Sequence, residues 1–346
     1  MKIRTPFYIF NKNLFSNLLK RYMEFGDVYY PVKANDSNLI IQAVKENGGN
    51  FEADSIEHII YLTKKGVSPD KIIYSFPIRE EEDIREAISL GIEIFVIDSV
   101  EEYFRITCIS KQVKFLLRIN ALENLTQVFL PEQSKWGMTL SEAKAMAGMI
   151  ETDGNKLFGI SFYLMYEVNQ KDAFDVVLQS IASTFSGVHM DVIDIGGGIN
   201  IDTLERLSAL LKDVLSSVGA KRIIIEPGRH LVDPCIEMSV SIIAIKEVFN
   251  NRLIFINSGI YSGLLDVILK QKRFEIIDPN HSEHSILKDT IICGSSSDVS
   301  DMIGVYMIRN DIKVGDRLII KNCGAYSAVM QTNFYGRKSI RMVVSK

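Results

Sequence analysis

The sequence predicts an α/β fold: a (β/α)8 barrel of the TIM type, followed by a smaller all-β barrel domain. Between residues 28 and 226, eight short apolar runs rich in Val, Ile, Phe and Tyr alternate with helical patterns. After residue 232 the apolar runs continue, but the helical patterns between them stop. Runs that are apolar throughout indicate strands buried on both faces. Eight strand–helix units favour a closed barrel, although the pattern alone also allows an open doubly wound sheet.

The elements of the barrel follow in a regular order. An amphipathic helix over residues 10–26 ends at a glycine, as many helices do. The predicted strands are 28–34, 50–53, 71–76, 93–98, 114–119, 158–164, 192–195 and 222–226. The predicted helices between them are 38–47, 56–65, 81–90, 100–109, 141–151, 172–185 and 203–218.

The β domain is predicted from the remaining apolar runs. Its strands are expected at 237–247, 253–256, 273–277, 290–293, 302–308, 317–321 and 340–344, and residues 1–9 could add another strand. The boundaries that follow are 10–235 for the barrel, and 1–9 with 236–346 for the β domain. No linker rich in Ser or Pro separates them, so we expect the two domains to be packed together.

Composition excludes several classes of protein. The 346 residues carry a net charge of −4, which indicates neither a nucleic acid nor a membrane surface as partner. No apolar run approaches the roughly 18 residues that span a bilayer, and the N-terminus does not resemble a signal peptide. The four cysteines are scattered, which favours reduced thiols and a cytoplasmic location. We expect no metal site, because His281 and His284 lie in a polar loop.

The strongest candidates for chemistry stand at the carboxyl ends of the predicted barrel strands, where such barrels carry their active sites. Lys33 ends the first strand, and a partly buried lysine amine can condense with a carbonyl group. The glycines at 196–198 could cradle a phosphate, and Arg229 could bind the same group. Glu226 could face a protonated ring nitrogen. Each of these roles has an alternative. Lys33 could face the solvent, the glycines could form an ordinary turn, and Glu226 and Arg229 could form a structural ion pair.

Together these residues describe a pyridoxal phosphate site, and here the chain resembles a known family. It is similar to the fold-type III pyridoxal phosphate enzymes, and among them to the ornithine/diaminopimelate/arginine decarboxylases of group IV. The motifs that carry this resemblance occur in the family's order along nearly the whole chain. They are PVKAN at 31–35, SKWG at 134–137, DIGGG at 194–198, EPGR at 226–229, GAY at 324–326 and TNFYG at 332–336.

The resemblance implies a role for each matching residue. Lys33 would hold the cofactor covalently, and Glu226 would keep its pyridine nitrogen protonated, which favours decarboxylation over the racemisation catalysed by relatives with an arginine there. Glu52 aligns with an acidic residue near the cofactor. Residues 294–298 would reach the partner's active site in a homodimer. The groups expected at the phosphate are Gly196, Gly197, Gly198 and Arg229, with Tyr326 nearby.

Four positions depart from the family pattern. Tyr163 replaces a histidine that stacks on the cofactor, and Tyr166 replaces a serine. Ser297 replaces a cysteine that returns a proton to carbon, and because a hydroxyl is a weaker acid, Asp298, Lys33 or water could serve instead. Lys270 falls near an acidic specificity residue and would attract an anionic group. Tyr261, aligned with a tyrosine at the cofactor phosphate, is expected beside the substrate with Lys270 and Asp298.

Three functions fit these observations. The first is a pyridoxal phosphate-dependent decarboxylase of an amino acid or an amino-acid-bearing conjugate, in antibiotic or siderophore biosynthesis. The second is an amino-acid racemase or epimerase on the same fold. The third is a non-catalytic regulatory relative, which the changes at Tyr163 and Ser297 favour and the retained Lys33 opposes.

Overall fold

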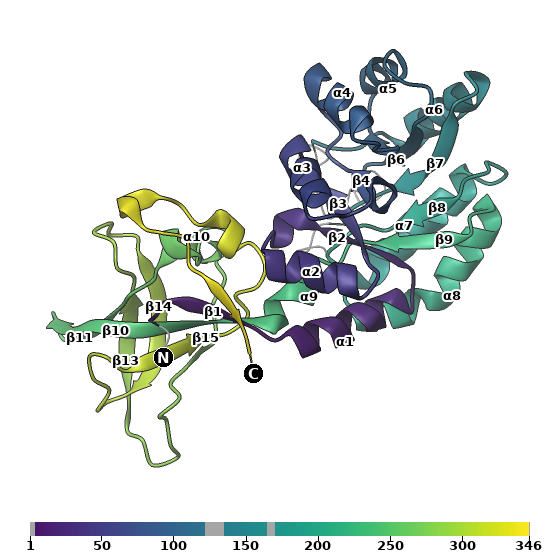
Figure 1. Ribbon diagram of the computed structural model, residues 1–346. Coiled ribbons are helices and arrows are strands. Elements are labelled where there is room, and N and C mark those ends of the chain that lie inside the picture. Colours follow the sequence, from purple (N-terminus) through teal and green to yellow (C-terminus); the bar gives the residue numbers. More distant parts are fainter. Residues whose placement is uncertain (1–3, 122–134, 165–169, 346) are drawn as a thin grey trace. The chain divides into compact units, whose positions relative to one another are not determined.

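The computed structural model describes residues 4–121, 135–164 and 170–345, and it divides them into two compact units. One unit comprises residues 18–32 and 44–230, and the other comprises residues 1–17, 33–43 and 231–346, apart from the residues not described. Figure 1 shows the helices and strands of each unit. No helix in the described ranges is both long and apolar enough to cross a membrane.

The larger unit is a closed barrel of eight parallel strands in sequence order. The strands are β2 (Asp27–Pro31), β3 (Asn50–Ala53), β4 (Ile72–Tyr74), β5 (Ile94–Ile97), β6 (Lys114–Arg118), β7 (Lys156–Ser161), β8 (Val192–Asp194) and β9 (Arg222–Ile225). The barrel closes between β2 and β9, where Asp27 pairs with Ile224. The predicted barrel class is confirmed, and the open sheet is excluded.

Each barrel strand is followed by a helix, although the helix after β9 is only four residues long. The helices of the chain are α1 (Lys12–Met23), α2 (Asn38–Glu46), α3 (Ile56–Lys64), α4 (Glu81–Ser89), α5 (Val100–Thr107), α6 (Leu140–Thr152), α7 (Gln170–Thr184), α8 (Ile201–Val218), α9 (Arg229–Val232) and α10 (Asp266–Leu269). Local sequence sets several helix starts. Thr139 forms a reciprocal capping box with Glu142, and the Asn200 side chain accepts a hydrogen bond from the Thr203 N–H at 2.8 Å.

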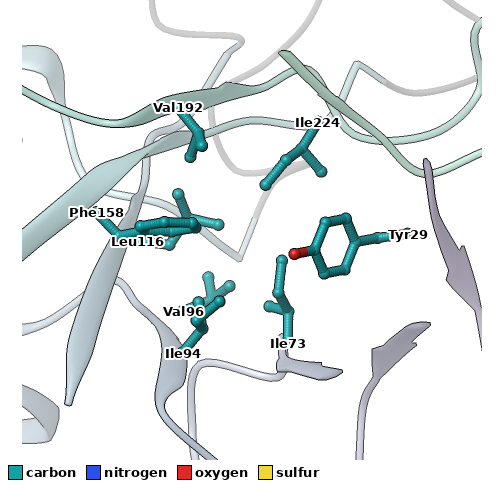
Figure 2. Close-up of a cluster of buried hydrophobic side chains, with 8 residues drawn as sticks. All are labelled: Tyr29, Ile73, Ile94, Val96, Leu116, Phe158, Val192 and Ile224. Atoms are coloured by element: carbon teal, nitrogen blue, oxygen red, sulfur yellow. The ribbon is translucent and has the colours of Figure 1, made fainter. Parts of the chain in front are cut away.

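The barrel interior is filled by side chains from seven of its eight strands. Figure 2 shows eight of these side chains pointing toward one another, and all are at least 95% buried. They are Tyr29, Ile73, Ile94, Val96, Leu116, Phe158, Val192 and Ile224. Burial of each large apolar side chain stabilises the fold by about 1.5–3 kcal/mol, so the barrel is a packed core and its chemistry is confined to the strand ends.

The smaller unit is built on an eight-stranded sheet in which the order β12-β15-β10-β11-β13-β14 is extended by β1 and β16. Its strands are β1 (Phe7–Phe10), β10 (Ile236–Val248), β11 (Asn251–Ile256), β12 (Ile276–Ile277), β13 (Leu287–Cys293), β14 (Met302–Arg309), β15 (Arg317–Ile320) and β16 (Met342–Val344). The N-terminal segment joins this sheet, since β1 pairs with both β10 and β16. The predicted second β domain is therefore confirmed, although the expected strand 273–277 is reduced to two residues.

Two strand predictions around the candidate site are wrong in detail. β2 ends at Pro31, and Lys33 lies in a short 3₁₀ helix, Val32–Ala34. β7 ends at Ser161, so Tyr163 belongs to the following loop. In both places the apolar run continues past the last strand residue, because the residues after the strand are also buried. An apolar pattern reports burial and does not mark where the strand pairing stops.

Candidate active site

The glycine turn Gly196–Gly198 directly follows β8 and lies against the chain that follows β7. Gly196 and Gly198 have φ values of +66° and +77°, a region that side chains other than glycine rarely adopt. A Cβ at Gly196 would lie 2.4 Å from the carbonyl oxygen of Phe162, and one at Gly197 would lie 2.6 Å from that of Glu226. Only glycine therefore fits at the positions of this turn, which lies at the barrel's carboxyl end.

Asp194, the last residue of β8, holds this turn in place through its carboxylate. Its Oδ1 accepts a hydrogen bond from the Gly196 N–H at 2.9 Å, and its Oδ2 accepts one from the Ser161 hydroxyl at 2.8 Å. The Gly196 carbonyl oxygen in turn accepts a hydrogen bond from the Glu226 N–H at 2.9 Å. Asp194 therefore fixes the ends of β7 and β8, and through Gly196 it also fixes the residue that follows β9.

The surroundings of Asp194 also raise the pKa of its carboxyl group. Its carboxyl group is fully buried, and burial raises its pKa from 3.8 to about 6, against the lowering effect of the Gly196 and Ser161 hydrogen bonds. The negative charge of Glu52 raises the pKa further, and the Glu226 side chain is hydrogen-bonded to Asp194. A hydrogen bond between two carboxyl groups requires a proton on one of them. Asp194 and Glu226 therefore hold a proton between them, whereas Glu52 acts on Asp194 through its charge.

Glu52 joins this group from β3, where its side chain is 1% exposed. The Ser75 hydroxyl, just after β4, is hydrogen-bonded to the Glu52 carboxylate and lies 3.0 Å from Oδ1 of Asp54. Neighbouring strands thus hold Glu52 at the carboxyl end of the barrel, as the sequence predicts. The role of Ser75 could not be predicted, because serine at a strand end is common.

Tyr163 lies beside the glycine turn. A Cβ on Gly198 would be 3.6 Å from Cε2 of the Tyr163 ring, and the side chain is 43% exposed. Arg229, the first residue of α9, is half-buried and follows Glu226 by three residues. The turn thus has an aromatic ring beside it, and the guanidinium group of Arg229 belongs to a residue four positions past the end of the adjacent strand β9.

The sequence did not reveal an aromatic contact at the ends of β4 and β6. The Phe76 and Trp136 rings meet edge to face, with centroids 5.3 Å apart. The Arg118 guanidinium, at the end of β6, lies 5.9 Å from the centre of the Trp136 ring. Trp136 belongs to the SKWG motif, whereas Phe76 belongs to none of the motifs. Ser134 and Tyr166 lie outside the described residues.

The segment that contains Lys33 is bound to a motif almost 300 residues further along. The Tyr326 N–H donates a hydrogen bond of 2.8 Å to the Ala34 carbonyl, and the buried Asn35 side chain donates one of 2.8 Å to the Gly324 carbonyl. Asn35 and Tyr326 therefore place Lys33 next to the GAY motif. The Lys33 side chain is exposed, whereas the strand pattern predicted that it would be partly buried.

A second group of polar and aromatic residues is found in the β domain. The Tyr261 ring lies 4.8 Å from that of Phe334, and its hydroxyl is hydrogen-bonded to Asp298. The Ser300 N–H donates a hydrogen bond of 2.7 Å to Oδ1 of Asp298 and holds the pKa of that carboxyl below its usual value. Ser297 is hydrogen-bonded to Tyr335. The structure thus brings the predicted Ser297, Asp298 and Tyr261 into one cluster.

Asp301, which the sequence analysis missed, organises this cluster. Its Oδ1 accepts a hydrogen bond from the Ile260 N–H at 2.8 Å, and its Oδ2 accepts bonds from the Ser296 N–H at 3.0 Å and hydroxyl at 2.7 Å. A Cβ at Gly294 would lie 2.1 Å from Oδ1 of Asp301. The Asp301 carboxylate therefore ties the segment before Tyr261 to the one before Ser297.

Lys270, the remaining predicted residue, is exposed at the end of α10. Its N–H donates a hydrogen bond of 3.0 Å to the Asp266 carbonyl. The structure therefore places its charge at the surface of the β domain, four residues from the buried Asp266. No group of three or more potential metal ligands occurs in the part of the chain that the structure describes.

Known proteins resemble this chain along most of its length. The family model of the pyridoxal-dependent decarboxylases, for their pyridoxal-binding domain, matches residues 13–233. Ornithine decarboxylase of Schizosaccharomyces pombe is 25% identical over 345 residues, which cover 91% of this chain and 77% of that protein. Antizyme inhibitor 2 of Xenopus laevis is 23% identical, over 89% of this chain and 73% of its own.

Solved structures show the same fold. The arginine decarboxylase of Paramecium bursaria Chlorella virus, bound to agmatine, superposes with a TM-score of 0.90 at 20% identity, over 99% of this chain and 96% of that one. The Vibrio vulnificus lysine/ornithine decarboxylase, complexed with cadaverine, gives a TM-score of 0.86 at 18% identity, over 99% and 94%. Because the family model matches more than half of the residues, the chain belongs to the family of the pyridoxal-dependent decarboxylases.

Proposed function

We propose that the chain is a pyridoxal phosphate-dependent decarboxylase of an amino acid or an amino-acid-bearing conjugate. The observation that carries this proposal is the position of Glu226, a carboxylate that follows β9 and is fixed by the Gly196 turn and by the buried Asp194. A carboxylate there can keep the pyridine nitrogen of the cofactor protonated, and the cofactor then supplies an electron sink for the electrons left when carbon dioxide departs.

The residues of the barrel fit this cofactor. The turn Gly196–Gly198 has no side chains of its own, so a phosphate could approach its main chain, and the guanidinium of Arg229 would add positive charge and donors. Lys33, exposed two residues after β2, would bind the aldehyde group. Tyr163, beside the glycine turn, offers a ring that can cover the cofactor. Tyr326 would be held near Lys33 by its bond to Ala34.

The chain's own groups would divide the remaining work. Glu226 would hold a charge opposite the ring nitrogen, and Asp194 would keep the Glu226 main chain in place. Glu52, buried on β3, would face the cofactor from another strand. Ser297 and Asp298 would act on the substrate, with Tyr261 and Lys270 beside it. We propose that they do so in a homodimer with shared active sites, because segment 294–298 resembles one that reaches a partner's site.

The proposed substrate class rests on few residues. Three of the four relatives named above are decarboxylases of ornithine, lysine or arginine, and their names support an amino acid as substrate. Lys270 and Tyr163 are the residues that support an acidic or conjugated amino acid instead. The role in antibiotic or siderophore biosynthesis and the cytoplasmic location stay predictions from the sequence.

A panel of amino acids tests the function. We expect carbon dioxide release from at least one free or conjugated amino acid, and loss of that release in Lys33→Ala. Lys270→Asp should lower activity on acidic substrates relative to basic ones, whereas Lys313→Asp, also at an exposed lysine, should leave the preference unchanged. An unchanged preference in Lys270→Asp would remove the acidic substrate from the proposal.

The two alternatives give different results in the same assays. A regulatory relative, favoured by the similarity to antizyme inhibitor 2, would neither bind pyridoxal phosphate at Lys33 nor release carbon dioxide. A racemase would invert the configuration of recovered substrate without losing its carboxyl group. Chiral analysis of the recovered amino acid therefore separates racemase from decarboxylase.

A further inference from the structure

Two hydroxyl groups that lie 38 residues apart in the sequence meet in the β domain. The Ser297 Oγ and the Tyr335 hydroxyl form a hydrogen bond with each other. Ser297 belongs to the loop between β13 and β14, whereas Tyr335 lies in the C-terminal segment before β16. Both side chains are exposed, so the bond is open to solvent and to a ligand.

The main chain of Tyr335 has an unusual conformation. Its φ and ψ values are 59° and 20°, in the left-handed region that glycine and asparagine enter most readily. The conformation costs a tyrosine about 1 kcal/mol or more, which other contacts must offset. The Tyr335 ring packs edge to face on Phe334, with centroids 4.4 Å apart, and Phe334 packs on Tyr261 at 4.8 Å. These contacts and the Ser297 bond hold the phenol in place.

The loop that carries Ser297 is fixed on both sides. On one side, Ser296 donates two hydrogen bonds to the buried Asp301 carboxylate, at 2.7 and 3.0 Å. On the other side, Asp298 accepts the Ser300 N–H at 2.7 Å and is hydrogen-bonded to Tyr261. Asp298 is thus engaged by other partners, and Tyr335 is the group that the structure places on the Ser297 hydroxyl.

We propose that Ser297 and Tyr335 act as one proton-donating pair, in which Tyr335 is a positioning residue that works through Ser297. This inference rests on the proposed function. A serine hydroxyl alone is a poor acid, whereas a phenol has an ordinary pKa of about 10 and is a far better proton source. The structure therefore supplies the acidity that a serine lacks at this position.

The proton balance of the step is simple. The Ser297 O–H bond breaks, and its proton forms a C–H bond with the carbon that has lost carbon dioxide. The Tyr335 O–H bond breaks at the same time, and its proton passes to the Ser297 oxygen. A proton from the solvent then returns to the Tyr335 oxygen, so each turnover consumes one solvent proton and needs no oxidant or reductant.

Kinetics of four variants test this pair in the full chain loaded with pyridoxal phosphate. Tyr335→Phe and Ser297→Ala should each lower kcat by about tenfold or more with little change in KM, and the double variant should lose no more than either alone. Ser297→Cys in the Tyr335→Phe background should restore most of the loss, because a thiol is acidic without help. Tyr306→Phe, which removes another tyrosine hydroxyl of the β domain, is the control and should have no effect.

A readout that needs no catalysis separates this inference from the proposed function. In protein labelled with fluorotyrosine, Tyr335→Phe identifies the Tyr335 ¹⁹F resonance, and Ser297→Ala should shift that resonance with or without cofactor. An unshifted resonance, additive losses or no rescue by cysteine would overturn the pair. If the resonance shifts but the protein releases no carbon dioxide from any substrate, the contact between the two hydroxyl groups is supported and the proposed decarboxylase function is contradicted.

Discussion

The buried Asp194 lowers the stability of the fold when it is ionised, although its hydrogen bonds hold the candidate site together. Its pKa is raised to about 6 by burial, so the folded chain binds a proton there more tightly than the unfolded chain does. The contribution of Asp194 to stability is therefore most favourable below about pH 4 and declines as the pH rises to about 6. Above that value the ionised form carries a penalty of up to about 3 kcal/mol.

We predict that Asp194→Asn raises the free energy of unfolding above pH 6 and that this gain disappears toward pH 4. The amide keeps an oxygen for the Gly196 N–H but cannot ionise. Urea unfolding of the cofactor-free protein at several pH values measures the difference, with the exposed Asp213→Asn as the control. A loss of stability that is the same at every pH would mean that the hydrogen bonds need a carboxylate, contrary to this account.

At the same scale, the sequence indicated some site residues and missed others. Lys33, Glu226 and the glycines were predicted because each belongs to a run of residues with a recognisable pattern. Asp301 and Ser75 were missed, because their roles arise from hydrogen bonds to segments distant in the sequence. Such contacts depend on the folded chain and leave no local pattern.

At the scale of elements, the turn after β8 is defined by its close approach to the chain after β7. Gly196→Ala should lower the affinity for pyridoxal phosphate and destabilise the fold, because its Cβ would lie 2.4 Å from the Phe162 carbonyl oxygen. Gly187→Ala is a matched control, since Gly187 also has a positive φ of 79° but no atom within 4 Å of the added carbon.

Titration of the cofactor and thermal unfolding compare these two variants. Gly187→Ala should cost about 1 kcal/mol from its conformation alone and leave cofactor affinity unchanged. If both substitutions lower cofactor affinity and stability equally, the close approach of Gly196 to Phe162 does not determine either property.

Element boundaries were less predictable than the elements themselves. The period of apolar residues located all eight barrel strands, whereas the ends of β2 and β7 were each placed three residues too late. The expected strand at 273–277 failed because only Ile276 and Ile277 pair with β15. Pairing is decided by the partner strand, which a single sequence segment does not contain.

For the whole molecule, the alternation of strands and helices was sufficient to predict the barrel, because it is a local pattern repeated eight times. The topology of the β domain was not predicted in the same way. There β11 pairs parallel with β13, and β1 pairs with β16 from the other end of the chain. Pairings between such distant segments have no signature in the order of apolar runs.

The proposed homodimer predicts complementation between inactive variants. Mixing Lys33→Ala with Asp298→Ala under conditions that exchange subunits should restore about a quarter of the wild-type activity, because half of the dimers are then mixed and each holds one intact site. Each variant alone and a mixture of Lys33→Ala with Glu226→Ala are the controls. Recovery in that second mixture would contradict the assignment of Lys33 and Glu226 to the same subunit's site.

The central claim is that the Lys33 amine binds the aldehyde of pyridoxal phosphate. Borohydride reduction of the loaded protein, followed by peptide mass spectrometry, locates the lysine to which the cofactor was bound. We predict that the reduced cofactor is recovered on the peptide containing Lys33 and that Lys33→Ala abolishes this labelling. Stoichiometric labelling of a different lysine, or none in the wild-type chain, would contradict the account.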